Sequence, residues 1–406
     1  MTIQELRARA ADTSAAELAP LTEQVAREAG MDDLAAAAAA LAAAPGGVQE
    51  LYDYGYACVE RGASFLAVPA LTEALRLAPG TRGILIELVA ALEREGRHAE
   101  AYALLKESGA GGLRDWPDRY LLAHNALMAG ELSAASEAVG LLAAPEDAVW
   151  EGAHARIRRT VGRADAVRGS AAPLGGRDLR GWHYVLTGGV LATLSPYGYD
   201  AGMNGRYAFL QDSPGACRHG LRRLGLVLHA AGLRPRSVSL LPDRSSRILG
   251  LAAAGVLGVP AQEYRPGNAD TVVVAYDLND VDETVLAALR ERTPGEVLYE
   301  RATCWTDPPA VSADMSGLLA QHCIEPWGER LHVDGRLPAD ARPAEEIAAD
   351  ILAAEEDRDE GDGATPPDPD EALAAFAGLA RQGGRWPDGP RERVASSGPV
   401  GSGRFA

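Results

Sequence analysis

The chain has 406 residues, of which 47% are apolar and 24% charged, and its formal net charge is −18. This length predicts two or three domains with their own hydrophobic cores. No apolar run approaches 18 residues and the first residues lack an apolar stretch, so we expect a cytoplasmic protein without a membrane span or signal peptide. Four cysteines without paired spacing argue against a secreted disulfide scaffold.

The basic residues exclude several enzyme classes. Lys106 is the only lysine among 39 basic residues, and no glycine-rich loop precedes it. P-loop NTPases, protein kinases and Schiff-base enzymes each need a lysine at a fixed place in the site. These classes are therefore excluded.

Residues 1–165 are predicted to form an all-α helical repeat domain. Gly62, Gly96 and Gly130 follow one another at intervals of 34 residues, and each lies between two apolar helical stretches. An alanine stands five positions after each glycine. We expect the glycine to form the turn of a helical hairpin and the alanine to let its helices approach. The next hairpin then covers the remaining apolar face.

This spacing resembles the tetratricopeptide repeat (TPR) family over residues 48–147. The first unit is the best match, and its signature positions hold Leu51, Tyr54, Gly55, Cys58, Gly62, Ala67, Leu71, Ala74 and Pro79. The later units depart from the family pattern at Val89, Ser108, Arg119 and Leu142. An irregular helical bundle with a coincident period is the alternative.

The TPR resemblance implies a groove that binds a protein or peptide partner. The positions that face the groove in this family hold Tyr52, Tyr56, Glu60, Ile86, Arg94, Tyr120 and His124. Tyrosines suit such a groove because they are large, rigid and amphipathic. The alternative is that the next domain of the chain covers them.

Residues 166–180 are predicted to be a linker, and residues 181–340 an α/β domain with a mostly parallel sheet. Strands are expected at 184–191 (a strand or strand–turn–strand), 237–241, 271–275 and 296–299, and helices at 218–231, 247–257 and 283–292. Parallel sheets bind ligands at the carboxyl ends of their strands. The loops Pro242–Arg247 and Tyr276–Asp282 are therefore the candidate site.

Residues 217–300 resemble a degenerate type I phosphoribosyltransferase. The stretch 238–260 matches the pyrophosphate-loop region, and 272–277 matches the substrate-binding strand. The family then needs a Thr/Gly-rich turn for a phosphate, but this chain has Asp277, Asp280 and Asp282 there, and these acids would repel it. The resemblance thus implies a decayed catalytic site, and a generic Rossmann-like sheet is the alternative.

The candidate ligand-binding residues at this edge are Arg244, Ser245, Ser246, Arg247, Asp277 and Asp280. Guanidiniums and hydroxyls at a helix start suit an anion, and the alternative is simple helix capping by Asp243 or Ser245. The aspartates suit a divalent cation, with solvated strand-end acids as the alternative.

Six further residues are candidates for a zinc site or a Cys/His nucleophile: Cys217, His219, Cys304, His322, Cys323 and His332. Their spacing contains no paired-ligand motif. We therefore predict neither a metal nor a cofactor.

Residues 341–406 are predicted to be a largely disordered acidic tail with short helices. Twelve acidic residues and one arginine lie between Glu345 and Glu371, and these give eleven of the eighteen net negative charges. The body is then only mildly acidic, so we expect no binding to duplex nucleic acid.

These patterns favour an adaptor or regulatory protein that binds a protein partner through the repeat groove, with a non-catalytic α/β domain. The alternative is a transferase or hydrolase with its site between the loops Pro242–Arg247 and Tyr276–Asp282. A small-molecule ligand of the α/β domain is left open.

Overall fold

A computed structural model describes residues 3–10, 13–109, 113–332, 335–357, 359–383, 386–396 and 398–403. The chain divides into two compact units, Met1–Ile157 and Arg158–Ala406. The division falls inside helix α10 (Glu151–Val167). Among the described residues, no helix combines the length and the apolar character needed to cross a membrane.

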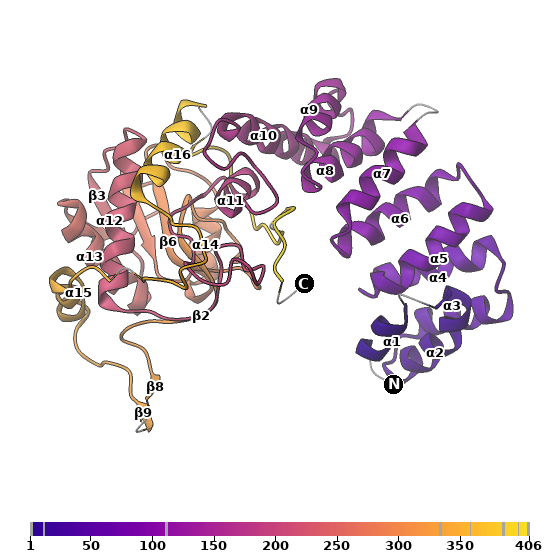
Figure 1. The fold of residues 1–406 in the computed structure, drawn as a ribbon, viewed down its shortest axis with the longest axis horizontal. Helices are drawn as coiled ribbons and strands as arrows, with labels where there is room; N and C mark the ends of the chain where they lie inside the picture. Colours follow the sequence, from indigo (N-terminus) through magenta and orange to yellow (C-terminus); the bar gives the residue numbers. More distant parts are fainter. Residues whose placement is uncertain are drawn as a thin grey trace. The chain divides into compact units, whose positions relative to one another are not determined.

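The first unit consists of helical hairpins in succession (Figure 1). They are α2 (Ala15–Glu28) with α3 (Asp32–Ala43), α4 (Val48–Glu60) with α5 (Ser64–Leu77), α6 (Arg82–Arg94) with α7 (His98–Ser108), and α8 (Tyr120–Met128) with α9 (Leu132–Leu141). The short helix α1 (Ile3–Ala10) packs on α2 and α5. Each second helix contacts the first helix of the next hairpin, so the hairpins stack on one another.

Glycine makes the turn in each of these hairpins. Gly62, Gly96 and Gly130 have φ angles of +73°, +68° and +84°, in the left-handed region that favours glycine. The structure therefore has turns at the three glycines at which the sequence predicted them. Gly30, with φ +71°, makes one more turn, and its distance of 32 residues from Gly62 falls outside the 34-residue period.

The apolar faces of the hairpins form the core of the first unit. At Gly55 a Cβ atom would lie 2.5 Å from Leu71 Cγ, so the missing side chain lets α4 and α5 pack closely. Tyr54 is fully buried, and its hydroxyl lies 2.9 Å from the Thr22 hydroxyl on α2. This buried hydrogen bond ties neighbouring hairpins together.

The second unit is built on a parallel sheet with the strand order β1-β7-β6-β5-β3-β4, and β2 also pairs with β7. The strands are β1 (Val190–Leu191), β2 (Tyr207–Gln211), β3 (Ser237–Leu240), β4 (Ala261–Glu263), β5 (Thr271–Ala275), β6 (Val297–Cys304) and β7 (Met315–Ile324). Every pairing in this sheet is parallel, and β5 lies with Val273 opposite Ser239 of β3 and Leu298 of β6. The predicted parallel α/β architecture is confirmed.

Helices cover both faces of this sheet. They are α11 (Leu179–Thr187), α12 (Pro214–Ala230), α13 (Arg244–Leu257), α14 (Glu283–Leu289), α15 (Ala344–Ala353) and α16 (Asp370–Gln382). Gly250 of α13 packs near Val274 of β5. Leu286 of α14 belongs to the same hydrophobic cluster as Val273, the preceding residue of that strand. Successive residues of a strand point to opposite faces, so α13 and α14 cover opposite sides. The antiparallel pair β8 (Arg330–His332) and β9 (Gly335–Leu337) is separate from this sheet.

The prediction of strand or strand–turn–strand over residues 184–191 is wrong for most of that range. Residues 184–187 belong to α11, and only Val190 and Leu191 form a strand. Asp178 caps α11 by accepting a hydrogen bond of 2.9 Å from the Gly181 N–H, and Gly188 ends it with φ +80°. The aromatic and β-branched residues suggested a strand, but here they form the buried face of a helix.

The prediction of a largely disordered tail over 341–406 is wrong for the described residues of that range. Ile351 of α15 and Leu373 of α16 are fully buried, and Figure 1 shows α16 beside α12, with which it is in contact. Trp386 is also fully buried. Arg391 is buried and forms ion pairs of 2.7 Å with both Asp314 and Glu296. Apolar stripes and buried ion pairs therefore hold the segment on the sheet unit, despite its charge.

Candidate functional site

The seven predicted groove residues lie on the first helices of three consecutive hairpins. Tyr52, Tyr56 and Glu60 belong to α4, Ile86 and Arg94 to α6, and Tyr120 and His124 to α8. Tyr56 is 47% exposed, Glu60 and Arg94 are exposed, and the others are half-buried.

The side chains of Tyr52 and Tyr56 form a stacked pair with ring centroids 6.4 Å apart. Burial and the nearby Glu87 carboxylate raise the pKa of Tyr52. Burial and the Glu60 carboxylate raise the pKa of Glu87, and Arg94 acts in the opposite direction. We call Tyr52, Tyr56, Glu60 and Glu87 the tyrosine–acid patch. Neither the Glu60 nor the Glu87 carboxylate forms an ion pair with a described residue.

An aromatic cluster lies around the start of α8. Trp116 stacks on Tyr120 and also approaches Trp150, both at 5.5 Å between centroids. Tyr120 stacks on His124 at 6.1 Å, and His124 meets His98 edge-on at 5.8 Å. Burial, with a contribution from His98, lowers the pKa of His124 to about 4. This imidazole is therefore neutral at pH 7, and the cluster offers a half-buried aromatic surface.

The two predicted loops of the sheet unit do meet, because the Tyr276 N–H donates a hydrogen bond of 3.0 Å to the buried Ser246 hydroxyl. Their polar groups, however, bind within the fold. Asp243 caps α13 by accepting from the Ser246 N–H at 2.8 Å, and the Ser245 hydroxyl accepts from Trp327 Nε1 at 2.9 Å.

The two arginines of this candidate site also have internal partners. Arg244 donates to the backbone carbonyls of Asp340 and Arg342, and Arg247 pairs with Glu263 at 2.9 Å. In this structure, the helix start serves capping and packing.

The edge that carries Asp277 and Asp280 is strongly acidic. Burial and the neighbouring Asp280 raise the pKa of Asp277 to about 6. Glu300 of β6, which the sequence did not single out, is fully buried, and burial with the Asp277 charge raises its pKa to about 8. Over the described residues, no group of three or more His, Cys, Asp or Glu side chains is arranged to hold a metal ion.

The cysteines and histidines lie in several environments. Cys217 is fully buried and donates to Asp212 Oδ2 at 3.3 Å, while burial raises the pKa of Cys323 to about 12. His219 contacts Glu356, and His322 stacks on Phe209 with ring centroids 5.8 Å apart. Cys304 is half-buried, and the side chain of His332 lies outside the described part of the chain.

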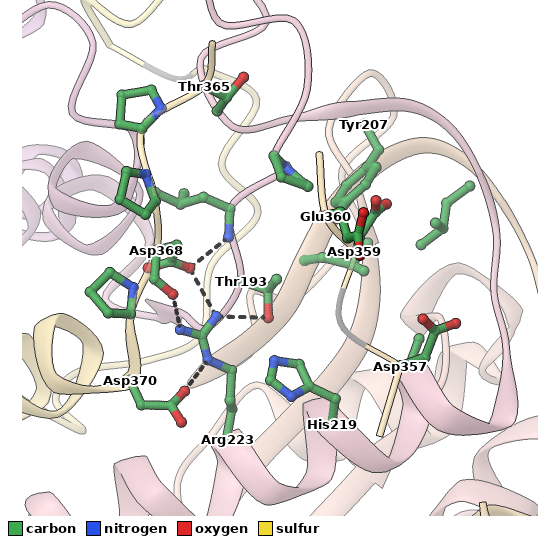
Figure 2. Close-up of a pocket in the computed structure, with 18 of the residues that line it drawn as sticks. Thr193, Tyr207, His219, Arg223, Asp357, Asp359, Glu360, Thr365, Asp368 and Asp370 are labelled. Atoms are coloured by element: carbon green, nitrogen blue, oxygen red, sulfur yellow. Dashed lines mark hydrogen bonds and ion pairs between the residues drawn. The ribbon is translucent and has the colours of Figure 1, made fainter. Parts of the chain in front are cut away.

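The sheet unit contains a cavity of about 940 Å³ that the sequence did not reveal (Figure 2). Its walls come from the residues that follow β1, from β2, from Arg301 of β6 and Leu318 of β7, from the first half of α12, and from the acidic residues 357 and 359–371. The residues that line it include Thr193, Ser213, His219, Arg223, Arg301, Asp357 and Asp368. This is the edge of a parallel sheet at which ligands bind in other α/β folds.

Buried ion pairs surround the cavity. Arg223, 2% exposed, lies 2.8 Å from Asp368 and 3.1 Å from Asp370 (Figure 2). Arg301 is equally buried and binds both oxygens of Asp212, at 3.0 and 2.8 Å. The sequence missed these pairs because each joins residues 89 or more positions apart.

Neither a scan against protein-family models nor a search of curated proteins finds a match for this chain. The two family resemblances therefore stay predictions, and the function is argued from the sites themselves.

Proposed function

We propose that this protein is a cytoplasmic adaptor that binds a partner protein through the first-helix surface of its TPR-like repeat unit. The observation that carries the proposal is the tyrosine–acid patch. Two stacked tyrosines, one of them 47% exposed, stand beside two carboxylates that lack an ion pair with a described residue.

The chemistry of the patch favours an arginine of the partner. A guanidinium stacks on a tyrosine face and donates paired hydrogen bonds to carboxylates. Glu60 and Glu87 raise the local negative potential, and Arg94 offsets only part of it. An arginine placed between Tyr56 and these acids would satisfy both groups at once.

The aromatic cluster supports an extended peptide as the ligand. It lies on α8 and on the short turns before α8 and α10, which hold Trp116 and Trp150, and α8 is the next first helix after α6 of the patch. Half-buried, rigid aromatic rings are typical of binding hot spots because they lose little entropy on binding. The favoured segment therefore combines an arginine with apolar residues that follow or precede it.

A non-catalytic role for the sheet unit is the second part of the proposal. The basic and hydroxyl groups of the loop Pro242–Arg247 all bind within the fold. The raised pKa values of Cys217 and Cys323 keep both thiols protonated at neutral pH, and a thiol is a poor nucleophile. The alternative is a transferase or hydrolase whose site lies between this loop and Tyr276–Asp282. Such an enzyme would need the basic and hydroxyl groups of the loop to be available to a substrate.

A peptide library presented to the full-length protein tests the proposal. We expect enrichment of peptides that contain arginine and apolar residues, and a loss of binding of at least about tenfold in the double variant Tyr52→Ala/Tyr56→Ala. Tyr102→Ala, which removes a tyrosine from the second helix α7, is the matched control and retains binding. Peptides selected without arginine, or unchanged binding by the double variant, would contradict the proposal.

A further inference from the structure

An acidic strap passes over the cavity of the sheet unit. We use this name for residues 354–369, of which residue 358 lies outside the described part. The strap connects α15 to α16 and contains no helix or strand among its described residues. Every described residue between the fully buried Ile351 and Leu373 is exposed or half-buried. Apolar burial therefore anchors the two ends of the strap but not the strap itself.

Asp368 fixes the strap at one side of the cavity. Its carboxylate pairs with Arg180 and with Arg223, each at 2.8 Å, and accepts a hydrogen bond of 3.1 Å from the Leu194 N–H. Burial alone would raise the pKa of Asp368, but the charges of the two arginines outweigh it and lower the pKa. The strap is thus held here by charge.

Asp357 fixes the strap at the start of α12. The hydroxyl of Ser213, the N-cap residue of this 17-residue helix, donates to Asp357 Oδ2 at 2.9 Å. One residue earlier, Glu356 pairs with Arg222 at 2.9 Å and shares a hydrogen bond of 3.1 Å with His219. A helix N-terminus and cationic side chains are features that favour phosphate groups as well as carboxylates.

Arg180 cannot lose Asp368 without another anion, whereas Arg223 keeps Asp370 at 3.1 Å. Arg180 and Arg223 have side chains that are 9% and 2% exposed, and the other contacts of the Arg180 guanidinium are two backbone carbonyls. A buried guanidinium without a counter-ion is strongly unfavourable. Displacement of the strap is therefore coupled to the arrival of a ligand that carries negative charge.

The cavity has room for a ligand beside a buried cation. Arg301 lines it, where its Nε and Nη2 atoms bind Asp212 and its side chain also interacts with Tyr299 and Cys217. The volume of about 940 Å³ lies in the range of small-molecule sites.

We propose that this cavity binds a phosphate-bearing small molecule and that the acidic strap is its built-in competitor. In the closed state, the carboxylates of Asp357 and Asp368 occupy the positions that the phosphate groups take when the strap is displaced. The site is independent of the repeat unit and of the loops Pro242–Arg247 and Tyr276–Asp282.

Calorimetric titration of the full-length protein with pyrophosphate at constant ionic strength tests this proposal, together with hydrogen exchange of the backbone amides of 354–369. We expect pyrophosphate to bind and to accelerate exchange in the strap. Asp368→Asn weakens the competitor and tightens binding by about tenfold. Asp357→Asn, at an exposed position that does not risk the fold, tightens it to a smaller extent.

Glu345→Gln is the matched control, because it removes the same charge at an exposed position of α15 outside the strap. Its affinity for pyrophosphate equals that of the wild type. The proposal is overturned if millimolar pyrophosphate binds to neither the wild type nor Asp368→Asn. Binding without faster strap exchange overturns it too, as does equal tightening by the control.

Discussion

Two groups of charged side chains, one in each unit, differ in their pairing. In the sheet unit, Arg223, Arg301 and Arg391 are buried, and each pairs with carboxylates of the same chain. In the repeat unit, Glu60 and Glu87 stand beside two tyrosines without an ion pair to a described residue. These buried charges hold distant segments of the sheet unit together, whereas the two carboxylates of the patch have no such internal counter-charge among the described residues.

We expect the largest loss of stability when a buried ion pair of the sheet unit is broken. Arg391→Ala leaves Asp314 and Glu296 buried with fewer counter-charges, so we expect the free energy of unfolding to fall by about 3–5 kcal/mol. Denaturant unfolding measures this loss. The control Arg393→Ala breaks an exposed pair with Asp307 and changes stability by less than about 1 kcal/mol. Equal effects of the two variants would show that the buried pairing is unimportant.

Glu300 is a buried carboxyl of the sheet unit that lacks such an ion pair with a described residue. The pH dependence of stability therefore tests its contribution. Its carboxyl accepts hydrogen bonds from the Leu278 N–H and the Thr303 hydroxyl and forms no ion pair with a described residue. Its folded pKa of about 8 lies above the ordinary value of 4.5, so the wild type loses stability as the pH rises from 4.5 to 8. Glu300→Gln removes this loss.

We therefore expect thermal unfolding of Glu300→Gln to match the wild type near pH 4.5 and to occur at higher temperature by pH 8. The gain is on the order of a few kcal/mol, since each pKa unit is worth about 1.4 kcal/mol. Glu291→Gln, at an exposed position of the same unit, shows no such pH window. A stability difference that does not vary with pH would contradict this account of Glu300.

The sequence predicted the features that depend on local spacing. Gly62, Gly96 and Gly130 make the turns that their 34-residue interval indicated, and the apolar run at 271–275 is the buried strand β5. The same reasoning misread residues 184–187, because aromatic residues on a buried helix face look like strand residues. The strand β7 was missed, because Gly317 and the polar residues near its end weaken the strand pattern.

The features that depend on distant residues escaped prediction. The charge of residues 345–371 suggested disorder, but Arg180 and Arg223 meet Asp368 only in the folded chain. The cavity was missed for the same reason, since the strap forms part of its wall. In the repeat unit, Tyr52 and Tyr56 were predicted from their positions, whereas Glu87 joins them from the next hairpin.

The most direct test of the central claim is the affinity of the full-length protein for an arginine-containing peptide from the library, compared with the same peptide carrying the uncharged isostere citrulline. Fluorescence anisotropy is measured with the wild type, with Glu60→Gln/Glu87→Gln, and with the control Glu107→Gln/Glu137→Gln on the second helices α7 and α9. We predict that the wild type and the control prefer arginine by at least about tenfold, and that the patch variant loses this preference. A preference that survives in the patch variant would contradict the account.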